Sequence, residues 1–152
     1  MSTPEERLAA LGLEVPEVAA PVAAYVPAVR SGSYVYTSGQ LPFRAGELMA
    51  AGKVGGAVTA EEAFGCAQQC VLNALAAIRT QVPLEQVRQV VKVTAYVASV
   101  PDFTGQPAVA NGASELLGEV FGDAGRHARA AVGVPVLPLD APVEVEMIVE
   151  VG

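Results

Sequence analysis

The sequence predicts a single α+β domain in which two main helices cover one face of a mixed sheet. Its 152 residues are the length of one ordinary domain. Hydrophobic residues recur with period 2 where strands are expected and with period 3.6 where helices are expected. Along the chain these patterns predict a hairpin, a helix, a strand, a helix and two more strands. Packing two helices against one sheet is the simplest way to bury such faces in two layers. We expect one domain over 1–152, with 1–23 forming a short helix and a connector packed on it.

The N-terminal segment carries helix signals over 3–11. Ser2 or Thr3 can cap this helix, and Gly12 can end it. The connector over 13–23 contains two prolines and no clean period, so we expect it to be extended.

A hairpin is predicted next, from the β-rich runs Tyr25–Val29 and Tyr34–Thr37 around a turn at 30–33. Pro27 cannot donate a ladder hydrogen bond, which puts the first strand at an edge of the sheet. The glycine-rich stretch over 41–58 is typical of a loop, with room for a short strand.

The clearest helix covers 60–80, where Thr59 and Glu62 have capping-box spacing. A second helix is expected over about 107–121, from Pro107 to the glycine that follows Phe121. The apolar stripe of the first helix consists of Ala60, Ala63, Phe64, Ala67, Val71, Ala74, Leu75 and Ile78, with Glu61, Gln68, Gln69 and Arg79 largely opposite.

Alternation predicts three more strands, at 87–98, about 128–134 and 143–151. The valine-rich phase of each strand should face the helices, and the other phase should form a helix-free face. The helix-facing set includes Val91, Val93, Ala95, Val97, Ala130, Val132, Val134, Val143, Val145, Met147, Val149 and Val151. The helix-free set includes Lys92, Thr94, Tyr96, Arg129, Ala131, Gly133, Glu144 and Glu146.

Composition narrows the possible partners. A formal net charge of −7 argues against nucleic acid, whose phosphates require a basic surface. Apolar types make up 52% of the chain and charged types 16%, which is more apolar surface than one small monomer needs. We therefore expect an oligomer.

Counts of special residues exclude several kinds of site. Two cysteines and one histidine are too few for a disulfide scaffold or a Cys/His zinc site. No apolar run is long enough to span a membrane. The acidic N-terminus lacks the features of a signal peptide, so we expect a cytoplasmic protein.

Two charged residues on the predicted helix-free face each allow two interpretations. Arg129 either pairs with a glutamate across strands, which the pattern alone favours, or binds a ligand carboxylate by two parallel hydrogen bonds. Glu144 is either a salt-bridge partner or a general base. Glu146 is a candidate partner for Lys92.

Several stretches, in this order after residue 20, resemble the RidA/YjgF family of reactive-intermediate deaminases, also labelled endoribonuclease L-PSP. The most recognisable are the Ser-Gly-Gln-x-Pro segment at 38–42 and the pair Ala128-Arg129. The others are Ala24-Tyr25-Val26, Val90-Val91-Lys92-Val93-Thr94, Asp102-Phe103 and Val143-Glu144-Val145-Glu146.

This resemblance implies a chorismate-mutase-like fold, a homotrimer and ligand sites in clefts between subunits. It implies hydrolysis of 2-imino acids to 2-oxo acids and ammonia, without metal or cofactor. Arg129 would bind the substrate carboxylate and Glu144 would position or activate water. The remaining cleft residues would be Tyr25, Ser38, Gly39 and Asn111, together with Ala131 beside the arginine.

The chain departs from the family pattern beside Arg129. His127 stands where many members have proline, and Ala131 stands where they have cysteine. We interpret His127 as a strand-entry residue with a structural hydrogen bond, with a proton carrier as the alternative. Cys66 and Cys70 are interpreted as small buried hydrophobes in a reduced protein.

The function that we expect first is hydrolytic deamination of small carboxylate-bearing imines. A non-catalytic, carboxylate-binding regulatory trimer is the alternative from another class. Cleavage of RNA ranks below both, because the sequence has no basic groove with interleaved aromatic residues.

Overall fold

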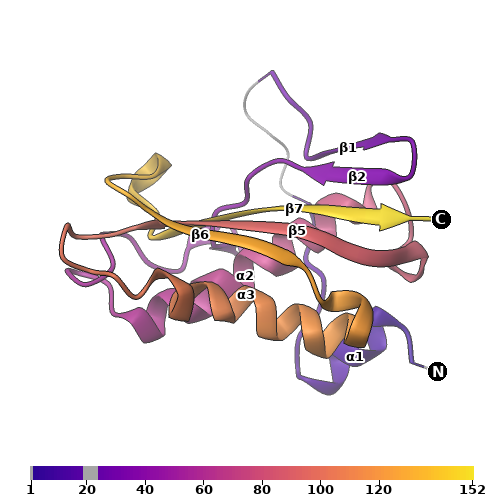
Figure 1. Cartoon of the computed structure of the whole chain (residues 1–152), viewed down its shortest axis with the longest axis horizontal. Helices are drawn as coiled ribbons and strands as arrows, with labels where there is room; N and C mark the ends of the chain where they lie inside the picture. The colour runs from indigo at the N-terminus through magenta and orange to yellow at the C-terminus, as the bar shows by residue number, and fades with distance from the viewer. Residues whose placement is uncertain (1, 19–23) are drawn as a thin grey trace.

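The computed structural model describes residues 2–18 and 24–152, and it has the two layers that the sequence predicts (Figure 1). A five-stranded sheet has the order β1-β2-β7-β5-β6, in which only β5 and β6 are parallel. The edge position of β1 agrees with the proline before it. The strands are β1 Ala28–Ser31, β2 Tyr34–Thr37, β5 Val87–Ala98, β6 Ala128–Val134 and β7 Val143–Val151.

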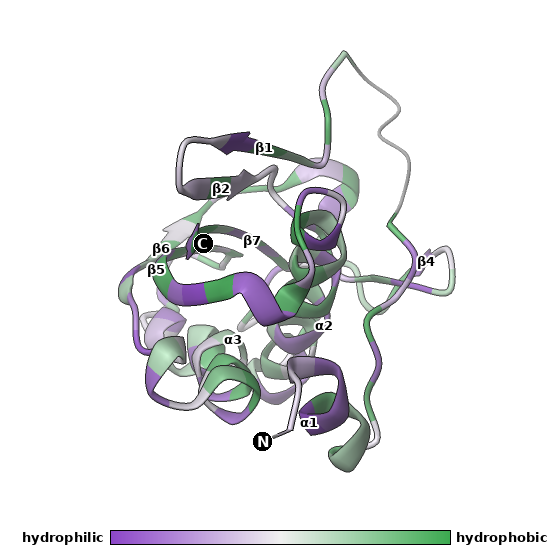
Figure 2. Ribbon diagram, turned by 90° about the vertical axis from the view of Figure 1, so that its right-hand side faces the viewer, coloured by the Kyte–Doolittle hydropathy of each residue, from purple (hydrophilic) through white to green (hydrophobic). Residues whose placement is uncertain are grey.

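Three α-helices form the second layer, and in both views they lie on one side of the sheet (Figures 1 and 2). They are α1 Pro4–Ala10, α2 Ala60–Arg79 and α3 Gln106–Phe121. Capping boxes at Thr3 and Thr59 begin α1 and α2, as their spacing predicts. Short 3-10 turns precede β5, β6 and β7, at η1 Leu84–Gln86, η2 Gly122–Gly125 and η3 Pro138–Asp140.

The connections between these elements are mostly short. The loop predicted over 41–58 contains a small two-stranded ribbon, β3 Phe43–Arg44 paired with β4 Glu47–Leu48. The first part of the predicted connector is irregular, and its residues 19–23 lie outside the described residues.

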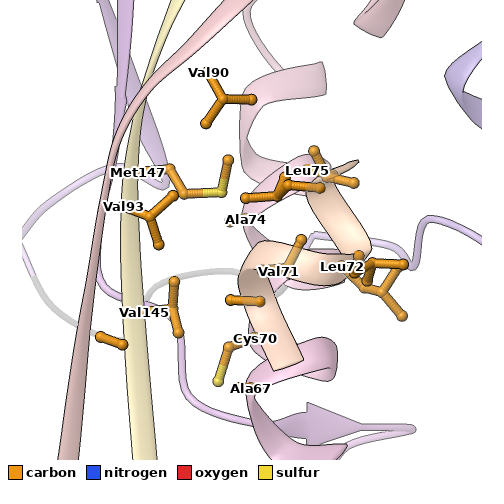
Figure 3. Packing of buried hydrophobic residues seen from close by; sticks show 14 of the residues in the cluster. Ala67, Cys70, Val71, Leu72, Ala74, Leu75, Val90, Val93, Val145 and Met147 are labelled. Atoms are coloured by element: carbon orange, nitrogen blue, oxygen red, sulfur yellow. The ribbon is translucent and has the colours of Figure 1, made fainter. Parts of the chain in front are cut away.

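The core lies between α2 and the middle of the sheet. Figure 3 shows Val93, Val145 and Met147 pointing from the strands toward Val71 and Ala74 of the helix. The helix is buried on more than its predicted stripe, because Gln69 is only 7% exposed. Its side-chain amide is satisfied there by Asn73, 3.1 Å away, so the prediction that Gln69 faces away from the core was wrong.

The crossing of α2 and α3 depends on the absence of a side chain. A Cβ at Gly112 would collide with the backbone carbonyl of Phe64. The two helices therefore approach more closely than any larger residue would permit. This contact fixes α3, which lies next to β6.

The face assignments of two strands differ from the sequence prediction. In β5 the ladder shifts between Val90 and Lys92, which leaves Val91 as an extra residue opposite β7. Val90 is consequently buried in the core in place of Val91, which is half-buried. Alternation alone cannot reveal a bulge, because the residues on both sides of it are valines.

The assignment of β6 was wrong by one residue. Arg129 lies beside Val93, Ala131 beside Ala95 and Gly133 beside Val97 in the parallel ladder. Because these β5 residues are fully buried under the helices, Arg129, Ala131 and Gly133 face the helix layer, and Val132 is exposed on the opposite side. The helix-free face keeps Lys92, Thr94, Tyr96, Glu144 and Glu146, as predicted.

Candidate functional site

Arg129 belongs to a hydrogen-bonded group between β6 and α3. Its Nη1 donates to Asn111 Oδ1 at 2.8 Å and to Ser114 Oγ at 3.1 Å. Asn111 and Ser114 are three residues apart, so they share one face of the helix. We call Asn111, Ser114, His127 and Arg129 the arginine cluster. The cross-strand ion pair that the sequence favoured for Arg129 is absent from the described residues.

The contacts of Arg129 leave part of its guanidinium available. All of its side-chain hydrogen bonds to described residues use Nη1, whereas Nε and Nη2 have no partner there. The edge formed by Nε and Nη2 has the fork geometry that binds a carboxylate through two hydrogen bonds. The arginine is thus held at one corner and open at the other.

His127 extends the cluster on the side of Ser114. Its Nδ1 lies 2.6 Å from the carbonyl oxygen of Gly125, which can only accept, so we assign the proton to Nδ1. In the neutral ring Nε2 then accepts from the hydroxyl of Ser114 at 2.8 Å. Both ring nitrogens are therefore used, which agrees with the structural interpretation of His127 at the strand entry.

A cavity of about 450 Å³ opens beside this cluster. Its walls come from the second half of α3, from η2 and from the start of β6. The lining residues are Ser114, Gly118, Gly125, Arg126, His127 and Arg129.

Glu144 lies in a second group, where the chain leaving β2 runs along β7. Gln40 and Val145 exchange backbone hydrogen bonds of 2.8 and 3.0 Å, which press the segment 38–40 against the strand. A Cβ at Gly39 would collide with the carboxylate of Glu144. We call Ser38, Gly39 and Glu144 the glutamate cluster.

The environment of Glu144 changes its acidity. Burial raises the pKa of the Glu144 carboxyl above its ordinary value, and the neighbouring Glu146 carboxylate raises it further. No side-chain hydrogen bond from a described residue reaches Glu144 to offset these effects. A carboxyl group with a raised pKa is suited to taking up and returning a proton.

The two clusters lie on opposite faces of the same sheet. Arg129 is beside Val93, which faces the helices, whereas Glu144 is opposite Tyr96, which faces away from them. Strand β5 also lies between their strands. One copy of this chain therefore does not bring Arg129 and Glu144 together on one small molecule.

Glu146 is engaged by a different partner from the one considered in the sequence. Tyr96 Oη donates to its carboxylate at 2.5 Å, and this hydrogen bond is the main cause that raises the pKa of Tyr96 to about 12. Lys92 lines the same small cavity of about 130 Å³ but forms no ion pair with Glu146. The expected Lys92–Glu146 pair is thus replaced by a tyrosine–carboxylate hydrogen bond.

The other predicted site residues are distributed as follows. Tyr25 is 56% exposed, and Ser38 is tied to the neighbouring chain by donation from its Oγ to the Val26 carbonyl at 2.6 Å. Ala131 faces the helices two residues after Arg129 and packs against the core. Sequence reasoning missed Ser114, although its helical spacing from Asn111 was a usable signal.

Both cysteines are buried and unpaired, as expected for small hydrophobic residues of a reduced protein. Burial raises the pKa of Cys66 to about 11 and that of Cys70 well above its ordinary value, so both thiols stay protonated. Within 2–18 and 24–152, no three His, Cys, Asp or Glu side chains are grouped to hold a metal ion. No helix in that part of the chain is long and apolar enough to cross a membrane.

Comparisons with known proteins agree on one family. The profile described as "YjgF/chorismate mutase-like, putative endoribonuclease" matches residues 5–151. Protein TCP17 of Trypanosoma cruzi is 42% identical over 144 residues, which are 93% of this chain and 90% of that protein.

Solved structures give the same result. Atu1372 of Agrobacterium tumefaciens, a protein of unknown function, is 43% identical, with a TM-score of 0.93 over 99% of this chain and 94% of its own. Escherichia coli TdcF with bound serine shares the fold at 23% identity, with a TM-score of 0.68 over 90% of this chain and 94% of its own. The chain belongs to the YjgF/chorismate mutase-like family.

Proposed function

We propose that this protein hydrolyses small 2-imino acids to 2-oxo acids and ammonia in the cytoplasm, in clefts between the subunits of a homotrimer. One observation carries the proposal. Arg129 and Glu144, the two groups suited to this reaction, lie on opposite faces of the sheet in one chain. A cleft between two copies can bring the arginine cluster of one copy to the glutamate cluster of the next.

Arg129 would bind the substrate carboxylate. Its Nε and Nη2 are free of described partners, while Asn111 and Ser114 hold Nη1 in place. Such preorganisation lowers the entropy lost when the ligand binds. TdcF, which shares the fold, was crystallised with serine, a molecule that carries one carboxylate.

Glu144 would act as the general base that activates the water. Water adds to the imine carbon while the glutamate accepts one of its protons and returns it to the nitrogen, which gives a carbinolamine. The remaining hydroxyl proton then passes to the nitrogen through the same carboxylate as the C–N bond breaks, so ammonia leaves and a ketone remains. The raised pKa of Glu144 helps both halves of this transfer. Positioned water and proton transfer suffice, because the imine is already reactive.

The helix-free face supports association with further copies. Val29, Tyr34, Tyr36 and Val132 are each between 41% and 52% exposed on this face. Apolar side chains gathered on one face of a soluble protein are typical of an interface. An odd-numbered ring of identical contacts needs a heterologous interface, which joins two different surfaces of neighbouring copies.

The family description also names endoribonuclease activity. The formal net charge of −7 opposes RNA binding. The two arginines of the cavity described above are too few for a backbone-tracking groove. We therefore prefer a small carboxylate as the substrate.

The test is release of a 2-oxo acid from a 2-imino acid that is generated in the assay. Wild type should accelerate release, and Arg129→Ala should reduce the acceleration by about 100-fold or more, because a charge-assisted bidentate contact is lost. Arg79→Gln, on the exposed end of α2, is the control and should behave as wild type. No acceleration by wild type, together with carboxylate binding that depends on Arg129, would favour the regulatory alternative. A monomer in sedimentation would contradict the shared cleft.

A further inference from the structure

The cavity beside Arg129 contains a second arginine that the proposed reaction does not use. Arg126 is exposed on the cavity wall, three residues before Arg129. Hydrolysis of an imine beside one carboxylate requires only one such anchor. The cavity therefore has more positive charge than the simplest substrate needs.

The charged side chains that line this cavity are all positive. Arg126 and Arg129 line it, and no carboxylate does; Glu115 and Glu119 of α3 and Asp123 of η2 are not among its lining residues. Among the described residues the only ion pair joins Lys53 and Asp140, so no described carboxylate neutralises either arginine. The cavity is therefore lined by positive charge in a protein whose formal net charge is −7.

The backbone of Arg126 is fixed, although its side chain is free. Its N–H donates to the carbonyl of Asp123 at 3.2 Å, and its carbonyl accepts from the side-chain amide of Gln89. The guanidinium makes no hydrogen bond to a described residue, and the backbone is extended there, with φ −69° and ψ 131°. Arg126 and Arg129 line the same cavity, so the two arginines can contact two anionic groups of one ligand.

The floor of the cavity is kept open by Gly118. A Cβ at this position would meet no atom within 4 Å, so the helix face is bare where the cavity passes α3. Ser114 forms hydrogen bonds with both His127 and Arg129, and Ser114 and His127 fill the wall between the two arginines without adding negative charge.

We propose that this cavity is a subsite for a second anionic group, so that the preferred substrates are 2-imino acids whose side chain ends in a carboxylate or phosphate. Arg129 binds the carboxylate beside the imine, and Arg126 binds the group at the far end. This inference rests on the proposed function, because it uses Arg129 as the first anchor. It assigns Arg126 and Gly118 as specificity-determining residues.

The experiment measures binding of stable product-like acids by titration calorimetry. The probes are 2-oxobutanoate with one anionic group, 2-oxoglutarate with a second carboxylate, and phosphonopyruvate with a phosphonate. Wild type should bind one of the two dianions about tenfold or more tightly than 2-oxobutanoate, the value expected for a hydrogen bond to a charged group. Which dianion is preferred identifies carboxylate or phosphate as the second group.

Two variants test the wall and the floor separately. Arg126→Gln should reduce the preference for the dianion to within about twofold and leave 2-oxobutanoate binding unchanged. Gly118→Leu should also remove the preference for the dianion, because the leucine side chain fills part of the cavity while both arginines stay. Arg79→Gln serves as the matched surface control. The chain has a single histidine, so the imidazole NMR signals of tag-free protein report directly whether a ligand reaches His127.

The outcomes separate this inference from the proposed function. Equal affinity for all three acids, with turnover intact, overturns the subsite and leaves the deaminase proposal standing. A dianion preference that survives both variants also overturns it. Absence of turnover together with Arg126-dependent dianion binding contradicts the deaminase proposal and supports the subsite.

Discussion

The arginine cluster and the glutamate cluster are built in different ways. Arg129 is held by the directional hydrogen bonds that it donates to Asn111 and Ser114 of α3, and its open edge is fixed in place. Glu144 has no such bonds from described residues and is shaped by burial and by the neighbouring Glu146 carboxylate. The structure of the arginine cluster fixes the position of a side chain, whereas the structure of the glutamate cluster changes the pKa of a side chain.

Neither cluster needs the other in order to form. Each is completed by elements of its own face, α3 for the arginine and the segment 38–40 for the glutamate. In the proposed trimer the two meet only through association.

The strongest test mixes two inactive proteins. Arg129→Ala and Glu144→Gln should each have little activity alone. After joint unfolding and refolding at equal amounts, about one quarter of the clefts would have both residues intact if each cleft uses two chains. Activity should therefore return to about a quarter of the wild-type value. If the mixture stays as inactive as its components, both residues come from the same chain and the shared cleft is wrong.

A second prediction concerns the close contact between Gly39 and Glu144. Gly39→Ala should lower kcat by about 10- to 100-fold, because the added Cβ displaces the carboxylate from its position. Carboxylate binding at the arginine cluster should change little, because Gly39 makes no contact with that cluster within one chain. Gly65→Ala on α2, where a Cβ meets nothing within 4 Å, is the control for a glycine substitution and should retain full activity. An unchanged kcat in Gly39→Ala would show that the position of Glu144 is unimportant.

The third prediction weakens the hold on Arg129. Ser114→Ala removes one of two contacts at Nη1 and the partner of His127 Nε2. We expect KM to rise by roughly tenfold, with kcat changed less, because hydrogen bonds to charged groups contribute about 1.5–3 kcal/mol. Ser114→Thr, which keeps the hydroxyl, should restore most of the loss. A fall in kcat with KM unchanged would instead indicate a role in the chemical step.

The smallest effect is one of stability. The folded-state pKa of Glu144 is raised above its ordinary value of 4.5, so folding is favoured when this carboxyl is protonated and disfavoured as pH rises through the folded pKa. Glu144→Gln cannot ionise, so the variant does not lose this stability as pH rises. Its Tm should exceed that of wild type at about pH 7, and the difference should shrink below about pH 4.5. Calorimetric melting at the two pH values checks this. A difference that does not depend on pH would contradict the raised pKa.

Most elements could be predicted from the sequence because their patterns are long. The capping box at Thr59 and the alternation of β7 each involve several consistent residues, and the observed bounds differ by about one residue. Family membership and the α+β fold were predicted correctly from the ordered short motifs.

The face of Arg129 could not be predicted, because β6 is an edge strand with weak hydrophobic contrast. Its sequence ARAAVGV places alanine on both faces, and burial of its residues ranges only from exposed to half-buried. The parallel pairing with β5 decides the face, and pairing partners are not visible in one sequence. The bulge at Val91 was hidden for the same reason, since a second valine precedes it.

For the candidate site, sequence resemblance supplied the residues but not their arrangement. The structure places Asn111 Oδ1 2.8 Å from Arg129 Nη1, a contact that the resemblance did not specify. Ser114 was recognised only once α3, η2 and β6 were placed around the cavity. Placing residues on opposite faces requires the register of three strands, which spacing along the chain does not contain.

The N-terminal helix has a consequence for handling the protein. Arg7 Nη1 donates a hydrogen bond of 3.0 Å to the carbonyl of Val120, in the last turn of α3. The next residue of α1, Leu8, is fully buried in the core. Trimming α1, or fusing a bulky partner directly before it, would release this carbonyl and loosen the turn that leads to Arg126. Hydrogen exchange at the amides of 120–125 would report the damage while circular dichroism stayed normal. A purification tag is therefore better attached through a long linker or at the C-terminus.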